Sequence, residues 1–427
     1  MLTRELNERL TRVGPGTPMG TLLRRYWYPI AASSELGQVP IQRRLLGENI
    51  VIYRTGNGEL ACIEAQCPHR RASLRYAIVE PDGIRCGYHG WLYGTDGQCL
   101  EQPAEPDNTS FRDRIKAVTY RAEELGGLIF IYMGPDPAPL LPHFDLFVWD
   151  NCLRDIGHAT LPMNWLQVME NSVDPHHVEW LHGHYMNFVR GISGEAKAEV
   201  LARKHEKIAF DVFDYGIIKR RVLEGMTEED DDWKIGHPLV FPATLRVGGG
   251  GHYQFQIRVP VDDTTTSHFW YDVYKPDGEY TVSPQESIPL FEVPLYDEQG
   301  NHLVDFVDGQ DVMAWASQGS IADRSNEHLG RSDLGVIMLR RLFQEQLDKV
   351  EEGQDPLGTV RDEAENVCIT LPQEKKKFGT GAGFRYEFLT MGQARYSPII
   401  EDVFALFDRA EKSQQPEAAP DQDAAPV

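Results

Sequence analysis

The pattern of apolar and polar residues divides the chain into two regions of different character. Between residue 41 and about residue 135, short apolar runs alternate with turns that contain Gly or Asp. Short runs rich in β-branched and aromatic residues, bounded by such turns, are typical of a small antiparallel β unit. We expect its strands at residues 43–46, 50–54, 60–63, 84–86, 92–93 and 128–132.

Longer elements follow. The pattern predicts a helix at residues 163–171 and strands at 208–213, 217–223, 253–259 and 268–274. The last two strands are expected to form a hairpin with a long loop over residues 262–266. A long helix should begin at Ser332 or Asp333 and end at Gly353, because Leu339, Phe343, Leu347 and Val350 repeat at helical spacing.

A Pro-rich stretch at residues 134–139 separates the two regions. We therefore expect an α+β protein with four segments: a helical or extended N-terminal segment (1–40), an antiparallel β domain (41–140), a larger second domain (141–411) and a disordered tail (412–427). The tail is expected to be disordered because it is rich in Pro, Ala, Gln and Asp.

The composition argues against nucleic acids and membranes as binding partners. The 427 residues carry a net charge of −23, whereas nucleic acids and anionic membranes require a basic surface. We see no apolar run of about eighteen residues and no signal-peptide core near Met1, so no membrane span or secretion is expected. Six cysteines without a framework spacing favour free thiols in a reducing cytoplasm.

The pair Cys67-Pro68-His69 and Cys86-Gly87-Tyr88-His89 is the most specific motif in the chain. Two Cys can hold one iron of a [2Fe–2S] cluster while two His hold the other, an arrangement that raises the reduction potential. Zinc is the alternative, but zinc fingers pair Cys with Cys and His with His, whereas each half here mixes the two. The motif therefore favours one-electron transfer through a Cys2His2 cluster.

A polar stripe marks the helix predicted at residues 163–171. Asn164, Gln167, Asn171 and Asp174 fall on one helical face. The simplest interpretation is a surface helix whose polar side meets water. Asp174 would then cap a following helix that has Pro at its first position.

The histidines after this stripe favour a metal site. His177 and His182 are five residues apart, a spacing that a regular α-helix does not align, but a bend or a helix end there could aim both rings at one point. Two His and one carboxylate form the facial triad of non-heme Fe(II) oxygenases. His176 and His184 are competing candidates.

The spacing does not by itself identify the third metal ligand. Asp174 could instead orient the ring of His177. Asp311 is the preferred third ligand, with Asp308 as the alternative, although spacing alone would leave either as a solvated acid.

These residues together resemble the oxygenase component of Rieske non-heme iron ring-hydroxylating oxygenases, most closely the phthalate dioxygenase-like group. The resemblance covers about residues 10–410. It is carried by the segments 14–20 with 24–27, the cluster motif at 67–69 and 86–91, the iron motif from Asn171 to His182, and the block 318–324 with Glu327 and Leu329.

The resemblance implies more than the spacing does. It implies a helix-grip second domain with a curved antiparallel sheet, homotrimers or stacked trimers, and electrons from NAD(P)H delivered by a reductase. It assigns Cys67, His69, Cys86 and His89 to the cluster and His177, His182 and Asp311 to iron. It makes Asp174 the link from His89 of one subunit to the iron of the next, with Asn171 nearby as a further site residue.

One position departs from the family pattern. Arg71 stands where the family usually has Gly in Cys-Pro-His-Arg-Gly. If that position requires a positive φ, Arg71 should be strained.

The expected reaction uses O2 to hydroxylate a small aromatic substrate, with an aromatic carboxylate preferred and O- or N-demethylation as the alternative. A carboxylate needs a cation in an otherwise apolar pocket. Arg220 and Arg246 are the candidates, since each lies in or beside a predicted strand, and Lys219 and Arg221 should face away from Arg220. A pure electron carrier would not need the second domain, and a respiratory Rieske subunit would have a further Cys at positions 70 and 88, where this chain has Arg and Tyr.

Overall fold

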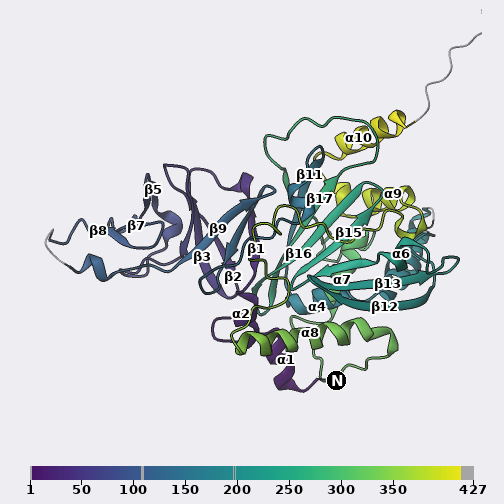
Figure 1. Ribbon diagram of the computed structural model, residues 1–427, viewed down its shortest axis with the longest axis horizontal. Coiled ribbons are helices and arrows are strands. Elements are labelled where there is room, and N and C mark those ends of the chain that lie inside the picture. The colour runs from purple at the N-terminus through teal and green to yellow at the C-terminus, as the bar shows by residue number, and fades with distance from the viewer. Residues whose placement is uncertain (1, 107–109, 196, 198, 415–427) are drawn as a thin grey trace, which may run out of the picture.

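The computed structural model describes residues 2–106, 110–195, 197 and 199–414, and Figure 1 shows them as two lobes along the long axis. The first lobe contains a six-stranded antiparallel sheet in the order β1-β10-β9-β4-β3-β2. Its strands are Trp27–Ala32 (β1), Ile41–Leu45 (β2), Glu48–Arg54 (β3), Leu60–Glu64 (β4), Thr119–Leu125 (β9) and Leu128–Tyr132 (β10).

A second, four-stranded sheet completes this lobe at its outer end (Figure 1). Its strands are Ile78–Glu80 (β5), Gly83–Arg85 (β6), Leu92–Gly94 (β7) and Cys99–Glu101 (β8). Buried Tyr53 and Ile63 of the larger sheet pack with Trp91 and Tyr93 in one core. All six strands expected in this region are present. The sheet also takes in β1, which lies within the segment 1–40, because β1 pairs with β10 along its length. The exact domain boundaries stay a prediction.

The second lobe is built on an eight-stranded sheet in the order β12-β13-β14-β15-β16-β17-β11-β18. Neighbouring strands are antiparallel except β18, which runs parallel to β11. The expected antiparallel second domain is therefore confirmed with one parallel edge strand. The bounds are Leu153–Leu161 (β11), His205–Phe213 (β12), Gly216–Leu223 (β13), His237–Val240 (β14), Thr244–Gly249 (β15), His252–Asp262 (β16), Thr265–Tyr274 (β17) and Leu290–Glu292 (β18).

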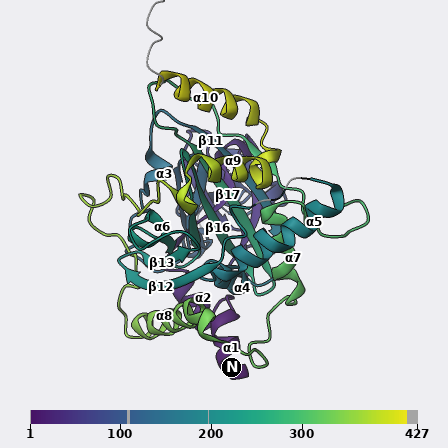
Figure 2. The same ribbon diagram turned by 90° about the vertical axis from the view of Figure 1, so that its right-hand side faces the viewer.

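Helices surround this sheet (Figure 2). Helix α4 packs against β16, α9 against β15, α6 against β13 and α8 against β12. The helices are Arg4–Thr11 (α1), Pro18–Leu23 (α2), Asp145–Val148 (α3), Trp165–Asn171 (α4), Met186–Ser193 (α5), Asp231–Lys234 (α6), Val307–Ser317 (α7), Leu334–Glu351 (α8), Ala382–Met391 (α9) and Ile400–Ser413 (α10). No helix in the described ranges combines the length and apolar character that a membrane crossing requires.

The two helices predicted from apolar spacing are present as α4 and α8. The apolar stripe of α8 is buried throughout, and Leu339 and Phe343 are wholly inaccessible to solvent. The tail was expected to begin at residue 412, but α10 continues to Ser413, and residues 415–427 lie outside the described ranges.

The prediction of a long hairpin loop at residues 262–266 is wrong. Asp262 pairs with Thr265, so β16 and β17 are joined by a tight turn of Asp263 and Thr264. The acidic residues that suggested a loop have specific partners. The carboxylate of Asp262 accepts the Thr264 N–H at 3.1 Å, and that of Asp263 accepts the Val13 N–H at 2.8 Å. The β-branched Thr265 and Thr266 can therefore extend the strand.

Candidate metal centres and substrate cavity

Two similar turns present the four residues of the cluster motif. In the first, the Arg71 N–H bonds the Cys67 carbonyl at 2.9 Å, and in the second the Gly90 N–H bonds the Cys86 carbonyl at 2.9 Å. Each turn thus begins with a buried Cys and carries a half-buried His two or three residues later. The imidazole centroids of His69 and His89 are 4.6 Å apart. Burial, and then the neighbouring Cys86, raises the pKa of the Cys67 thiol.

This donor set fits a Rieske cluster. The two sulfurs lie inside the lobe and the two rings lie nearer the surface, which suits a cluster held by Cys on the inner iron and by His on the outer iron. The Trp91 ring stacks on His69 at 4.3 Å, and the Tyr93 hydroxyl lies 3.2 Å from the Cys67 sulfur. Both contacts fix the orientation of residues that would hold the cluster.

Arg71 has the positive φ that its place at the family's glycine position suggested. Its φ is +59°, in the left-handed region that favours glycine. Its guanidinium contacts Glu64 at 2.8 Å, and the side chain is 61% exposed. Because exposed ion pairs contribute little, this contact offsets the backbone strain only in part.

The spacing of the two iron-motif histidines is explained by a π-helix. In an α-helix, residues five apart point about 140° away from one another. The segment Val178–Tyr185 (η4) instead forms a π-helix, whose i→i+5 hydrogen bonds bring residues five apart onto one face. The rings of His177 and His182 therefore lie 5.2 Å apart between centroids.

Asp311, on α7, completes the group. The ligand atoms of His177, His182 and Asp311 all lie within 4.8 Å of one another. One Asp311 oxygen is 3.3 Å from His182 Nε2 and 3.9 Å from His177 Nε2. Burial would raise the pKa of Asp311, but His182, His177 and Arg258 lower it, so the carboxylate is ionised. Two imidazoles and one carboxylate that converge from one side would suit a transition-metal ion and leave its other coordination positions open.

Asp308, the alternative third ligand, is hydrogen-bonded to other residues. One of its oxygens accepts the Trp270 Nε1–H and the other accepts the Gln393 N–H, each at 2.7 Å. Of the two acids, Asp311 is the one that faces the histidines.

The competing histidines lie in other surroundings. His184 packs on the exposed Trp180 ring. His176 forms a second compact group with Glu179 and His205. There Glu179 already accepts the His205 backbone N–H at 2.8 Å. Burial, and then Arg221 and His176, lower the pKa of His205 to about 2, so this imidazole is neutral.

Two further residues contact the triad. The amide of Asn171 donates to Asp311 at 3.3 Å, and Asp174 lies 3.7 Å from His177 Nδ1. Asp174 also accepts the His176 N–H at 2.9 Å, which is the capping role expected from the sequence. Burial would raise the pKa of Asp174, but His177 and Lys219 lower it to about 2.

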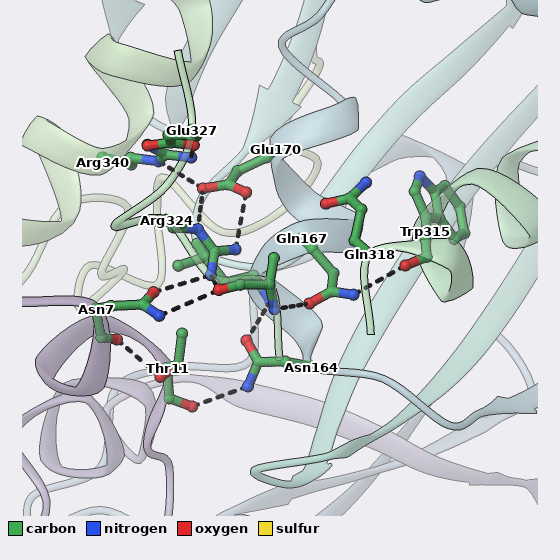
Figure 3. A network of polar contacts seen from close by, with 12 residues as sticks. Asn7, Thr11, Asn164, Gln167, Glu170, Trp315, Gln318, Arg324, Glu327 and Arg340 are labelled. Atoms are coloured by element: carbon green, nitrogen blue, oxygen red, sulfur yellow. Dashed lines mark hydrogen bonds and ion pairs between the residues drawn. The ribbon is translucent and has the colours of Figure 1, made fainter. Parts of the chain in front are cut away.

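The polar stripe of α4 is buried, so its interpretation as a surface helix is wrong. Figure 3 shows that its side chains bond segments far away in the sequence. The Asn164 amide donates to the Thr11 carbonyl at 2.9 Å. The Gln167 amide donates to the carbonyls of Trp315 and Gly319 at 2.9 and 2.8 Å. Gln167 thus joins α4, which carries Asn171, to the end of α7, which carries Asp311.

Glu170 anchors the same helix through charge. Its carboxylate accepts two bonds from Arg324, each 2.8 Å long, and a third from Arg340 at 2.6 Å (Figure 3). All three side chains are buried. Arg324 also contacts Asn7 at 3.0 Å, so α1 is part of the support.

A cavity of about 580 Å³, partly open to solvent, adjoins the triad. Its apolar walls include Leu245, Val247, Phe384 and Phe388, and its polar lining includes His177, His182 and Asp311. Three buried cationic side chains, Lys219, Arg221 and Lys377, also line it.

The two arginines expected to bind substrate do not line this cavity. Arg220 lies on the other face of β13 and bonds Asp211 and the Trp233 carbonyl, each at 2.6 Å. Arg246 is buried against Asp145 and Gln373. Lys219 and Arg221, which alternate with Arg220, point into the cavity instead. The sequence did show charged residues on both faces of this largely apolar strand. Alternation alone, however, does not say which face lines the cavity.

Comparisons with known proteins agree with this geometry. The Rieske [2Fe-2S] domain family matches residues 26–117, and the LigXa C-terminal domain-like family matches residues 131–286 and 298–372. The 5,5'-dehydrodivanillate O-demethylase oxygenase subunit of a Sphingobium species is 42% identical over 87% of this chain and 87% of its own length. The chain belongs to the Rieske aromatic oxygenases, as an oxygenase (α) component.

Further relatives support the assignment. The oxygenase subunit of phthalate 4,5-dioxygenase from Pseudomonas putida is 31% identical over 84% of this chain and 89% of its own length. The solved structure of a Pseudomonas putida CBB5 NdmA variant with caffeine has a TM-score of 0.58 and 23% identity, covering 78% of this chain and 93% of that one. The oxygenase is therefore an oxidoreductase that uses a Rieske cluster and a mononuclear iron.

Proposed function

We propose that this oxygenase removes the methyl group from a small methoxylated aromatic carboxylate. The observation that carries the proposal is the cavity that the triad, buried cations and apolar side chains line together. The relative that is 42% identical is named an O-demethylase, which favours demethylation. Ring hydroxylation is the second candidate, because the relative at 31% identity is named a dioxygenase.

The proposed reaction balances with one O2, two electrons and two protons. The aryl methyl ether becomes a phenol, the methyl carbon leaves as formaldehyde, and the second oxygen atom becomes water. A reductase supplies the electrons from NAD(P)H. When bound, the cluster relays single electrons and the iron activates O2.

The proposal gives each residue a role. Cys67, His69, Cys86 and His89 hold the cluster, and His177, His182 and Asp311 hold the iron. Asn171 orients Asp311 through its 3.3 Å hydrogen bond. Gln310 holds the ring of His182, since its amide oxygen lies 3.1 Å from Nδ1.

We also propose a homotrimer in which electrons pass between subunits. The cluster loops lie beside the four-stranded sheet at one end of the long axis, and α7 and β13 lie in the other lobe (Figure 1). Asp174, beside His177, would connect a cluster histidine of the neighbouring subunit to the iron. The exposed rings of Tyr88, beside the cluster, and Trp180, in η4, are suited to such a contact. A cytoplasmic location is proposed because the free thiols of Cys62, Cys99, Cys152 and Cys368 persist in reducing surroundings.

A single turnover tests the reaction. The metal-loaded protein is reduced without air and mixed with methoxylated and unsubstituted aromatic carboxylates, and then ¹⁸O2 is admitted. Formaldehyde and the matching phenol from methoxylated compounds alone would support demethylation. Ring products carrying one or two labelled atoms would favour hydroxylation, and products only from uncharged compounds would contradict the carboxylate assignment.

A further inference from the structure

The cations that line the cavity are not equivalent. Arg221 is paired with buried Asp232 at 2.9 Å. Lys377 is paired with buried Glu374 and also donates to His237 Nδ1 at 3.3 Å. Both charges are thus balanced within the protein, and neither needs a ligand for neutrality.

Lys219 has no such partner. The residue is 3% exposed and lines the cavity, and its side chain makes no hydrogen bond or ion pair with the described part of the chain. The acid that acts on it most strongly is Asp174, but Asp174 is engaged by His177 and by the His176 N–H. A buried amine that no protein group partners is costly, so its presence beside an open cavity indicates that a ligand partners it.

We propose that Lys219 is the specificity-determining residue of this oxygenase: it binds the carboxylate of the aromatic substrate. The inference rests on the proposed function and assigns its substrate contact to one side chain. A substrate anchored there would share the cavity with the apolar side chains of Leu245, Val247 and Phe384 and with the triad.

The surroundings of Lys219 also predict that this side chain takes up a proton when a carboxylate binds. Burial, and then Arg221 and Lys377, lower the pKa of Lys219 to about 7. In the empty cavity, Lys219 is therefore largely neutral above pH 7. A bound carboxylate raises its pKa again, so binding above pH 7 takes up a proton and weakens as the pH rises further. The other charged or titratable groups around Lys219 are Asp174, Glu374, His177, His205 and His237.

The binding test compares carboxylates with their uncharged carboxamides. Three pairs span the cavity size: 3-methoxybenzoate, 1-naphthoate and biphenyl-3-carboxylate, each with its amide. Calorimetry on the metal-loaded, oxidised protein gives the Kd. Lys219→Met should weaken carboxylate binding about 10- to 100-fold while leaving amide binding within about twofold. Lys219→Arg should restore part of the loss.

Arg220→Met is the matched control, because it removes a cation from the next position on the opposite face of β13. It should leave both ligand series unchanged. Calorimetry at pH 8 in two buffers of different ionisation enthalpy should show uptake of close to one proton for the wild-type protein and none for Lys219→Met.

Unchanged carboxylate affinity in Lys219→Met, or tighter binding of the amides by the wild-type protein, would overturn the proposal. The proposed function is judged separately by product formation. Oxygenated product from a Lys219→Met protein with wild-type carboxylate affinity removes the inference alone. Lys219-dependent binding without oxygenated product from the wild-type protein removes the function but keeps the binding site.

Discussion

The two metal ends of the oxygenase are built in opposite ways. At the cluster end, two short turns close on themselves through backbone bonds such as Gly90 N–H to the Cys86 carbonyl, and the two histidines of the motif lie near the surface. At the iron end, Asp311 is far in sequence from His177, and the end of its helix α7 bonds a buried network that reaches α1 (Figure 3). The cluster end should therefore respond to changes in its own loops, and the iron end to changes at distant residues.

The largest effect is expected from Asp311→Ala. Loss of the carboxylate should remove the mononuclear iron and lower turnover more than about 100-fold, since changes that only reorient a ligand already cost 10–100-fold. Iron analysis should fall from about three to about two atoms per chain, with the cluster absorbance intact. Cys86→Ser is the reciprocal variant and should lose the cluster absorbance instead. Loss of both metals in Asp311→Ala would show that the two ends are not independent.

Glu170→Ala should destabilise the second lobe by about 3–5 kcal/mol, because it leaves Arg324 and Arg340 buried without a counter-charge. Denaturant unfolding followed by tryptophan fluorescence measures this, and cluster absorbance reports the first lobe separately. Glu345→Ala, which removes an exposed ion pair with Arg341, is the control and should cost no more than about 1 kcal/mol. Equal losses in the two variants would contradict the buried network.

Gln167→Leu should cost about 1–3 kcal/mol, because it leaves the carbonyls of Trp315 and Gly319 and the Ala322 N–H without their partner. Since this residue joins α4 to α7, iron should also dissociate faster on exposure to a chelator. Gln318→Leu changes an exposed glutamine beside the network and should alter neither quantity. Identical chelator kinetics in Gln167→Leu would show that the junction does not position Asp311.

The smallest effect is expected at the cluster end. Arg71→Gly should raise the free energy of unfolding by about 0.5–1 kcal/mol, because glycine adopts the positive φ without strain. Arg70→Gly, at an adjacent residue without positive φ, should lower it. Thermal unfolding followed by cluster absorbance compares the two, and a stability loss in Arg71→Gly would mean that its contact with Glu64 outweighs the strain.

The same contrast explains what could be predicted from the sequence. The residues proposed to hold the cluster are close in sequence, so Cys67, His69, Cys86 and His89 could be proposed, and the strands around them predicted, from local pattern. His177 and His182 were also accessible, but the π-helix that aligns them was not, because its hydrogen bonds depend on packing. Spacing left Asp308 and Asp311 open, since only the tertiary bonds of Asp308 to Trp270 and Gln393 separate them.

Burial of polar residues was the main obstacle. The stripe of α4 has the pattern of a solvated face, yet Asn164 and Gln167 are buried because distant carbonyls satisfy them. On β13, both faces are largely buried, so alternation could not tell Arg220 from Lys219. In each case the outcome depends on a partner more than a hundred positions away or on a neighbouring strand, and local pattern does not contain it.

The π-helix also limits how the gene can change. Deleting one codon between His177 and His182 would allow an ordinary α-helix, in which the two histidines, now four apart, still share a face. Inserting one codon there, by contrast, would rotate the residues that follow by about 100°. Gly183 would leave its place beside Ala202, where an added Cβ would lie 2.4 Å from the Ala202 Cα. An insertion is therefore the change that this segment tolerates least.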